Sequence, residues 1–258
     1  METKTMLVVG NIFSNFAEMH EMVITFDSFF EILETGFVDK FYLRIGQGIS
    51  NTELTEIVQA IAASKHKNKF IFNDTKLLAY QDDAEHQRKV HKHYSSNVMI
   101  SPPLNLGASC FTSELHLQSD CEELGDHTTG QHIQGMILVE AARQMMLSVS
   151  ENYLLKEGIK GNAYFVLHNI NIVFKNFMFP ANAEIRFIAS NIEHKKGGSM
   201  HAESITTFFQ NDIEMAEVSI DFTAYDQNYI AAKENAMAEA TCDVIAETCE
   251  AEQELKYA

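Results

Sequence analysis

The sequence predicts an α+β fold in which an antiparallel sheet wraps around one buried helix, preceded by a smaller α/β unit. The first observation is the segment 136–149, which is apolar on almost every side and therefore belongs inside a protein. The second is its place in the chain, because two strand-like segments precede it and four follow it. The third is the pattern of residues 5–73, where short apolar runs alternate with helical ones, as in a partly parallel sheet.

Residues 1–85 are predicted to form the small α/β domain. Its glycine-containing turns, Gly10-Asn11-Ile12 and Gly46-Gln47-Gly48, are too sparse for a dinucleotide or Walker phosphate loop. We therefore interpret the domain as structural, or as a docking unit. The expected strands are 6–10, 22–25, 40–46 and 69–72, and the expected helices are 27–34 and 51–63.

Residues 86–227 are predicted to form the domain with the antiparallel sheet, and a polar, charged linker is expected over 74–95. Gly197-Gly198 and Asn211-Asp212 mark turns between the last three strands. Residues 228–258, rich in Ala and Glu, are predicted to form an acidic C-terminal helix or tail. The expected strands of the sheet are 97–100, 109–117, 163–177, 184–192, 200–210 and 214–225.

The composition excludes several classes of function. With 36 acidic and 19 basic residues the formal charge is −17, which argues against a nucleic-acid partner. The four cysteines form no CxxC pair, a usage typical of reduced thiols in the cytosol. No signal peptide and no run long enough to span a membrane is recognised. We expect a soluble, cytoplasmic protein with neither nucleic acid nor membrane as a partner.

A polar loop with two histidines, His127 and His132, leads directly into the apolar helix. The few polar side chains of the helix follow one another at offsets of three and four, so they form a single stripe. A buried carboxylate is costly unless it is paired or hydrogen-bonded, so Glu140 is the most informative member. The stripe consists of Glu140, Arg143, Gln144 and Ser148.

This loop and helix resemble the A-factor (γ-butyrolactone autoinducer) synthase family of hotdog proteins. The family signature DH-x-x-DHxPGM-x-LLEAARQ is similar to Asp126-His127, followed by QHIQGM at 131–136 and LVEAARQ at 138–144. Val90-His91-Lys92 is similar to the family's VHK opening. The likeness covers one repeat, about residues 88–226. Gln131 and Gln134 stand where the family has Asp and Pro, and one residue is inserted between the histidines.

The resemblance implies a hotdog fold and an acyl-thioester substrate. The implied reaction transfers a β-ketoacyl or fatty acyl chain from acyl carrier protein or coenzyme A to a small hydroxylated acceptor, in signal or secondary-metabolite biosynthesis. No cofactor and no metal are expected beside the thioester. A lone hotdog domain normally completes its cleft by pairing, so a homodimer is expected. The alternatives are a 3-hydroxyacyl-thioester dehydratase and a non-catalytic acyl-binding or scaffold protein, with residues 1–85 docking a partner.

The candidate catalytic residues are His127, Glu140 and His132. Related hotdog dehydratases place a loop histidine and a helix carboxylate on either side of the thioester, and imidazole can transfer protons near neutral pH. The structural alternatives are that Glu140 only pairs with Arg143 to fix the helix, and that His132 only caps it. His91 and His168 are interpreted as ordinary sheet residues.

The candidate substrate-binding residues lie at the start of the helix and one turn beyond Glu140. The free amides of Gly135 and Met136, at the positive end of the helix dipole, can polarise a thioester carbonyl. Arg143 can keep Glu140 ionised, and Gln144 follows on the same stripe. Asp126, His127 and His132 lack a third metal ligand at usable spacing, so no metal site is predicted.

Overall fold

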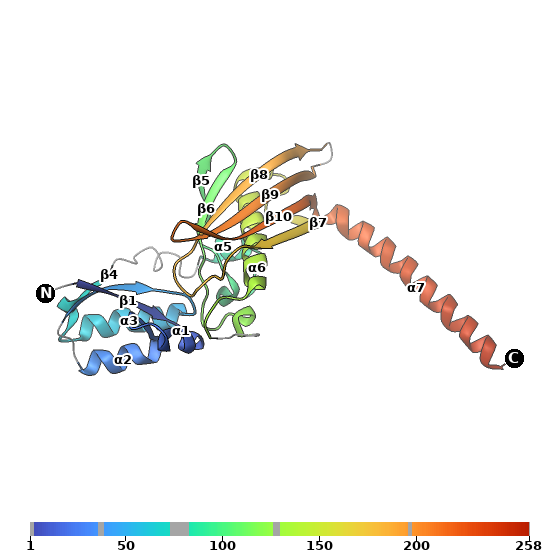
Figure 1. Cartoon of the computed structure of the whole chain (residues 1–258). Helices are drawn as coiled ribbons and strands as arrows, with labels where there is room; N and C mark the ends of the chain where they lie inside the picture. Colours follow the sequence, from blue (N-terminus) through green and yellow to red (C-terminus); the bar gives the residue numbers. More distant parts are fainter. Residues whose placement is uncertain (1–2, 36–38, 73–82, 126–129, 196–197, 258) are drawn as a thin grey trace.

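The computed structural model describes residues 3–35, 39–72, 83–125, 130–195 and 198–257. Its strands form two sheets, a parallel one of four strands near the N-terminus and an antiparallel one of six strands (Figure 1). The six-stranded sheet curves around the long helix α6 (Gly135–Val149), and the C-terminal helix α7 (Gln227–Tyr257) projects away from it. The predicted α+β class, with a small α/β unit ahead of a hotdog domain, is confirmed.

The N-terminal sheet has the order β2-β1-β3-β4, and all its pairs are parallel. Apolar side chains of the sheet pack against α2 and α3, with Phe29, Leu54 and Ile57 almost completely buried. The hydroxyl of Ser50 and the carboxylate of Glu53 form a capping box that starts α3. The elements are β1 (Thr3–Val9), η1 (Asn11–Phe13), α1 (Ser14–Glu18), β2 (Val23–Thr25), α2 (Phe26–Thr35), β3 (Lys40–Ile45), α3 (Asn51–Ala63), η2 (Lys67–Lys69) and β4 (Phe70–Phe72).

The buried side chain of Gln47 joins this unit to the hotdog domain. Its amide nitrogen Nε2 donates to the carbonyl oxygens of Leu115, at 3.0 Å, and Ala181, at 3.3 Å. Its oxygen Oε1 accepts from the backbone N–H of Leu117 at 2.7 Å. A Cβ on Gly46 would lie 2.2 Å from the Pro180 carbonyl oxygen, so the two units pack backbone against backbone here. The carboxyl end of β3, where α/β sheets commonly bind ligands, is thus covered by the chain's own hotdog domain.

The hotdog sheet has the order β5-β6-β8-β9-β10-β7, with antiparallel pairing throughout. Ala141, Ala142 and Met145 of α6 are fully buried against it, as expected for a helix with apolar residues on nearly every side. A π-helical turn, Ser150–Leu154, extends α6. The other elements are α5 (Ala84–Lys89), η3 (Ser95–Asn97), β5 (Leu104–Gly107), β6 (Cys110–Glu114), η4 (Glu122–Gly125), β7 (Ala163–Phe174), β8 (Glu184–His194), β9 (Met200–Gln210) and β10 (Ile213–Asp226).

Two expectations about the region before α6 are wrong. Residues 97–100 do not form a strand, because Ser95–Asn97 is a 3-10 turn and only Ile100 makes a β-bridge, to Leu115. The strand at the edge of the sheet, beside β6, is instead β5. The short turn that connects β5 to β6 has Ala108 and Ser109 at positive φ. Of the expected linker 74–95, residues 74–82 lie outside the described residues. The remainder carries α5, whose buried His86 lies 2.9 Å through Nε2 from the Ile100 carbonyl oxygen.

The C-terminal helix α7 occupies most of the segment for which the sequence predicts an acidic helix or tail. Ile230 is buried near its start, and Tyr229 stacks on Tyr225, which anchors the first turn to the sheet. No helix in the described part of the chain is both long and apolar enough to cross a membrane.

Candidate functional site

Glu140, in the second turn of α6, is the centre of a charged hydrogen-bond network. Arg143 donates to both of its carboxylate oxygens, from Nε at 2.7 Å and Nη2 at 2.8 Å. Gln144 Nε2 donates to Oε1 at 3.1 Å, and Lys92 Nζ lies 3.0 Å from the same oxygen. Lys92 also pairs with Glu123, at 2.8 Å. The two-pronged contact with Arg143 is the strongest geometry available to a carboxylate.

This network fixes the charge on Glu140. Burial raises the pKa of its carboxyl, but the hydrogen bond and charge of Arg143, with Lys92 and Gln144, outweigh burial and hold the pKa below its ordinary value. Glu140 is therefore ionised at neutral pH and is poorly suited to donate a proton. It can instead orient the guanidinium of Arg143, which also lines a cavity.

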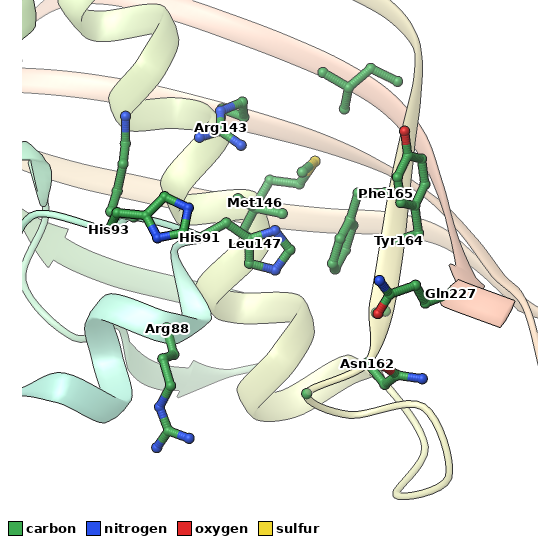
Figure 2. A pocket seen from close by; sticks show the side chains of 14 residues that line it. Arg88, His91, His93, Arg143, Met146, Leu147, Asn162, Tyr164, Phe165 and Gln227 are labelled. Carbon is green, nitrogen blue, oxygen red and sulfur yellow. The ribbon is translucent and has the colours of Figure 1, made fainter. Parts of the chain in front are cut away.

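A cavity of about 540 Å³ lies between α6, the turn after α5 and the start of β7. In Figure 2, Arg143 and Met146 of α6 lie on one side of it and Tyr164 and Phe165 of β7 on the other. Basic and imidazole groups line one part, contributed by Arg88, His91, Lys92, His93 and Arg143. An apolar wall completes it, formed by Met146, Leu147, Ala163, Phe165 and Leu167. The cavity thus offers an apolar wall and a polar one rich in basic groups.

His91 is the titratable side chain best placed for proton transfer in this cavity. Its ring packs edge-on against Phe165, with centroids 5.6 Å apart, and remains accessible from solvent. Partial desolvation of the ring by neighbouring protein atoms lowers the pKa of His91 below 6.5, and the charge of Arg143 lowers it further. A neutral imidazole at pH 7 can accept a proton. The expectation that His91 is a sheet residue is wrong, because it lies in a turn after α5 at φ +57°.

A second cavity, of about 550 Å³, lies at the start of α6. The ring of His132 packs edge-on against Phe177 there, with centroids 4.9 Å apart. Gly135 begins the helix beneath Phe174, and a Cβ on it would lie 2.4 Å from that ring, so a side chain is excluded. The side chain of Gln134, the residue at the N-cap of α6, makes no capping hydrogen bond.

The predicted site residues are distributed over both cavities. His132 and Gly135 line the second and Arg143 lines the first, while Met136 points outward, 67% exposed. Gln144 has no exposed surface. Its Oε1 accepts from Met99 N at 2.9 Å and its Nε2 donates to the Asn97 carbonyl at 2.8 Å, which holds α6 against that segment. We therefore treat Gln144 as a positioning residue. His127 lies outside the described residues.

Sequence reasoning missed His91 and Lys92 as members of the site. The signal for both residues is Val90-His91-Lys92, which matches the family's VHK opening. The sequence does not predict that Lys92 lies beside Glu140, because the two residues are 48 positions apart. Several turns and the first two strands of the hotdog sheet lie between them.

Both cavities have lining residues from α6 and β7, and we call the region between these two elements the α6–β7 groove. Within the described residues β7 pairs only with β10, so its other edge is open. Ile170 and Phe174 of β7 pair with Ile220 and Ala216, which are buried on the α6 side of the sheet, yet they are themselves 41% and 54% exposed. The inner face of the sheet therefore carries exposed apolar side chains at this edge.

Comparison with known proteins identifies one family. Residues 82–226, more than half of the chain, match the hotdog domain of A-factor biosynthesis, AfsA. No curated protein matches the chain.

Among solved structures, a thioesterase from Haemophilus influenzae is 13% identical, with 51% of this chain and 82% of that chain covered and a TM-score of 0.37. A putative thioesterase from Shewanella oneidensis is 8% identical, with 59% and 96% covered and a TM-score of 0.38. A mutant thioesterase from Pseudomonas aeruginosa is 10% identical, with 60% and 94% covered and a TM-score of 0.39.

Proposed function

Because the chain belongs to the family of the A-factor biosynthesis hotdog domain, we propose that it processes an acyl thioester in the groove between α6 and β7. The observation that carries this proposal is the first cavity, where a polar wall rich in basic groups faces an apolar one. A thioester substrate has the complementary character, because its acyl chain is apolar and its pantetheine arm ends in phosphate. The expected donors are β-ketoacyl or fatty acyl chains on acyl carrier protein or coenzyme A.

The reaction we favour is acyl transfer to a hydroxylated acceptor. His91 accepts the proton of the acceptor hydroxyl, whose oxygen attacks the thioester carbonyl carbon. The C–S bond then breaks, and protonated His91 returns the proton to the leaving thiolate. Arg143, held by Glu140, stabilises the negative charge that develops on the carbonyl oxygen. Glu140 acts in this scheme as a positioning residue.

The basic groups around the first cavity support an anionic donor or acceptor. Arg88 lines this cavity and also a neighbouring one, where Lys89 and Lys160 lie beside the carboxylates of Glu85 and Glu151. Such a cluster is notable on a chain with a net charge of −17. It fits the phosphate of a pantetheine arm, or the phosphate of an acceptor of the dihydroxyacetone phosphate type.

The alternative reaction, dehydration of a 3-hydroxyacyl thioester, is supported by the second cavity. There His132 lies near the start of α6, whose dipole can polarise a thioester carbonyl. His127 remains a candidate for the same reaction on sequence grounds. A third alternative is a protein that binds an acyl thioester without turning it over.

One assay separates these possibilities. The protein is incubated with β-ketoacyl and 3-hydroxyacyl thioesters, on coenzyme A and on carrier protein, with and without dihydroxyacetone phosphate, and products are identified by mass spectrometry. Acyl transfer gives an ester only when the acceptor is present, and dehydration gives an enoyl thioester without it. Retention of an unchanged thioester supports the binding protein. If no thioester is bound or converted, the proposal is wrong.

We also propose that two copies of the chain pair along the open edge of β7. Such pairing covers Ile170 and Phe174 and closes both cavities from the side that is open in the single chain. Antiparallel pairing of two β7 strands also satisfies the backbone N–H and C=O groups of that edge.

A further inference from the structure

The outer face of the hotdog sheet, away from α6, carries a group of side chains that the acyl-thioester proposal does not use. Alternation along β9 buries Met200 and Ala202 toward α6 and places His201 on the opposite face. Asp221 of β10 and His168 of β7 lie beside it, so three strands contribute one side chain each.

His168 lies at a β-bulge of β7. Asp221 pairs with Asn169 and Phe222 with Leu167, so His168 is the additional residue of β7 at the register shift. Alternation from Leu167, which pairs with the buried Phe222, places His168 on the outer face, and the bulge places the next residue, Asn169, on that face beside Asp221. Bulges commonly redirect a side chain at a functional site.

The potential ligand atoms of His168, His201 and Asp221 all lie within 4.8 Å of one another. His201 Nδ1 is 3.6 Å from Asp221 Oδ1. The hydroxyl oxygen of Thr223 lies 2.8 Å from His168 Nε2 and 3.3 Å from His201 Nδ1. The imidazole rings of His168 and His201 therefore each direct a nitrogen toward the Thr223 hydroxyl, next to the carboxylate of Asp221.

A second, independent observation indicates a cation at that point. Asp221 Oδ1 is buried and has no hydrogen-bond partner among the described residues. In addition, Asp221 pairs directly across the ladder with Glu203, although like charges at directly opposite positions are destabilising. A bound cation supplies the missing partner of Oδ1 and offsets the repulsion between the two carboxylates.

We propose that His168, His201 and Asp221 bind one zinc ion on the outer face of the sheet. Two imidazole nitrogens and one carboxylate oxygen form a ligand set that zinc commonly uses, with the fourth position left to water. Imidazole ligands argue against Ca²⁺ and Mg²⁺, which prefer oxygen. The ion joins β7, the open edge strand, to β9 and β10, so its effect is to hold the bulge and the edge in place.

Zinc titration of the full-length, tag-free chain by calorimetry tests the proposal. We expect one zinc per chain at this site, and we expect H168Q, H201Q and D221N each to weaken its binding at least tenfold. Replacement with cobalt should give the visible absorption of a four-coordinate ion, lost in the same variants. Bound zinc should also raise the midpoint of thermal unfolding in the wild type and not in the variants.

Two further variants serve as controls. H194Q removes an exposed histidine of β8 and should leave binding unchanged. T223V removes the hydroxyl between the rings, and zinc binding should persist because the three ligands remain. Circular dichroism verifies that every variant is folded without metal. The proposal is overturned if the wild type binds no zinc, if the three ligand variants bind as the wild type does, or if T223V abolishes binding while H168Q does not.

Discussion

At the scale of single residues, Glu140 shows how one carboxylate can organise a site without taking part in proton transfer. Its charge is matched by Arg143 and Lys92, and its side chain is only 19% exposed. The pair of Glu140 and Arg143, which the sequence analysis gave as a purely structural alternative, is present in the structure. It does not exclude a functional role, because the same pair holds Arg143 at the wall of the first cavity.

Glu140→Gln is expected to lower the free energy of unfolding by about 2 kcal/mol at pH 7, because two partly buried cations lose their counter-charge. The pKa of Glu140 is lowered in the folded state, so its contribution is fully present above the ordinary value of 4.5 and is lost as the pH falls through the folded-state pKa. The difference between wild type and variant should therefore shrink below about pH 4.5. Urea unfolding at pH 7, 5 and 4 measures it.

Glu157→Gln is the matched control, because Glu157 is exposed and pairs only with Lys160 among the contacts of the described residues. Its effect should stay within about 0.5 kcal/mol. A difference between wild type and Glu140→Gln that is the same at pH 7 and pH 4 contradicts the assigned role of the charge.

His91→Asn is expected to lower kcat/KM for acyl transfer about a hundredfold or more, because it removes the proposed general base. Asn tolerates the left-handed backbone at this position, so the turn is preserved. The pKa of His91 is lowered, so the acidic limb of the wild-type pH–rate profile should lie below pH 6.5 and should disappear in the variant. Steady-state rates between pH 5 and 9 test both points.

His93→Asn is the control, because His93 lines the same cavity and lies two residues after His91 in the chain. We expect it to retain the acidic limb. If His91→Asn keeps full activity while His127→Ala abolishes it, the reaction belongs to the loop before α6 and the assignment of His91 is wrong.

At the scale of elements, the N-terminal sheet supports the hotdog domain. Phe16 of α1 donates its backbone N–H to the Gly130 carbonyl at 2.9 Å, just before the second cavity. The ring of Phe16 also stacks on Phe179, with centroids 5.5 Å apart, beside the segment that lines that cavity. The N-terminal unit therefore packs against the hotdog domain of its own chain.

Gln47→Ala is expected to lower the free energy of unfolding by about 3 kcal/mol, because Leu117 N–H and two carbonyl groups lose their partner in a buried position. Chemical denaturation measures this loss. Gln59→Ala on the exposed face of α3 is the control and should cost little. A small effect for Gln47→Ala contradicts the view that this side chain joins the two units.

At the scale of the whole molecule, the open edge of β7 decides whether the groove is complete in one chain. Ile170→Glu is expected to prevent the proposed dimer, because it places a charge where a second copy covers an apolar side chain. Sedimentation or light scattering should show a monomer for Ile170→Glu and a dimer for the wild type. Ile188→Glu, on an exposed position of β8, should remain dimeric. A wild type that is monomeric at all concentrations contradicts the proposal.

The sequence by itself determined the elements with strong periodicity and the family. Helix 51–63 and strand 200–210 agree with α3 and β9 at both ends, because a capping residue, turn signals and a regular apolar pattern mark them locally. The apolar segment after the histidine loop is the central helix, and the motif that it carries identified the family. These features depend on neighbouring residues, so they can be read without coordinates.

Only the tertiary structure decided which polar groups meet. Gln144 binds Met99, Gln47 binds Leu117, and Lys92 reaches Glu140 across several elements. The contact of Lys92 with Glu140 also brings the neighbouring His91 to the cavity that Arg143 lines. Hydrogen bonds of this kind join residues far apart in the chain, and periodicity reports only which face of an element is buried. The sequence therefore determined the core and the fold, and the folded chain determined the composition of each candidate site.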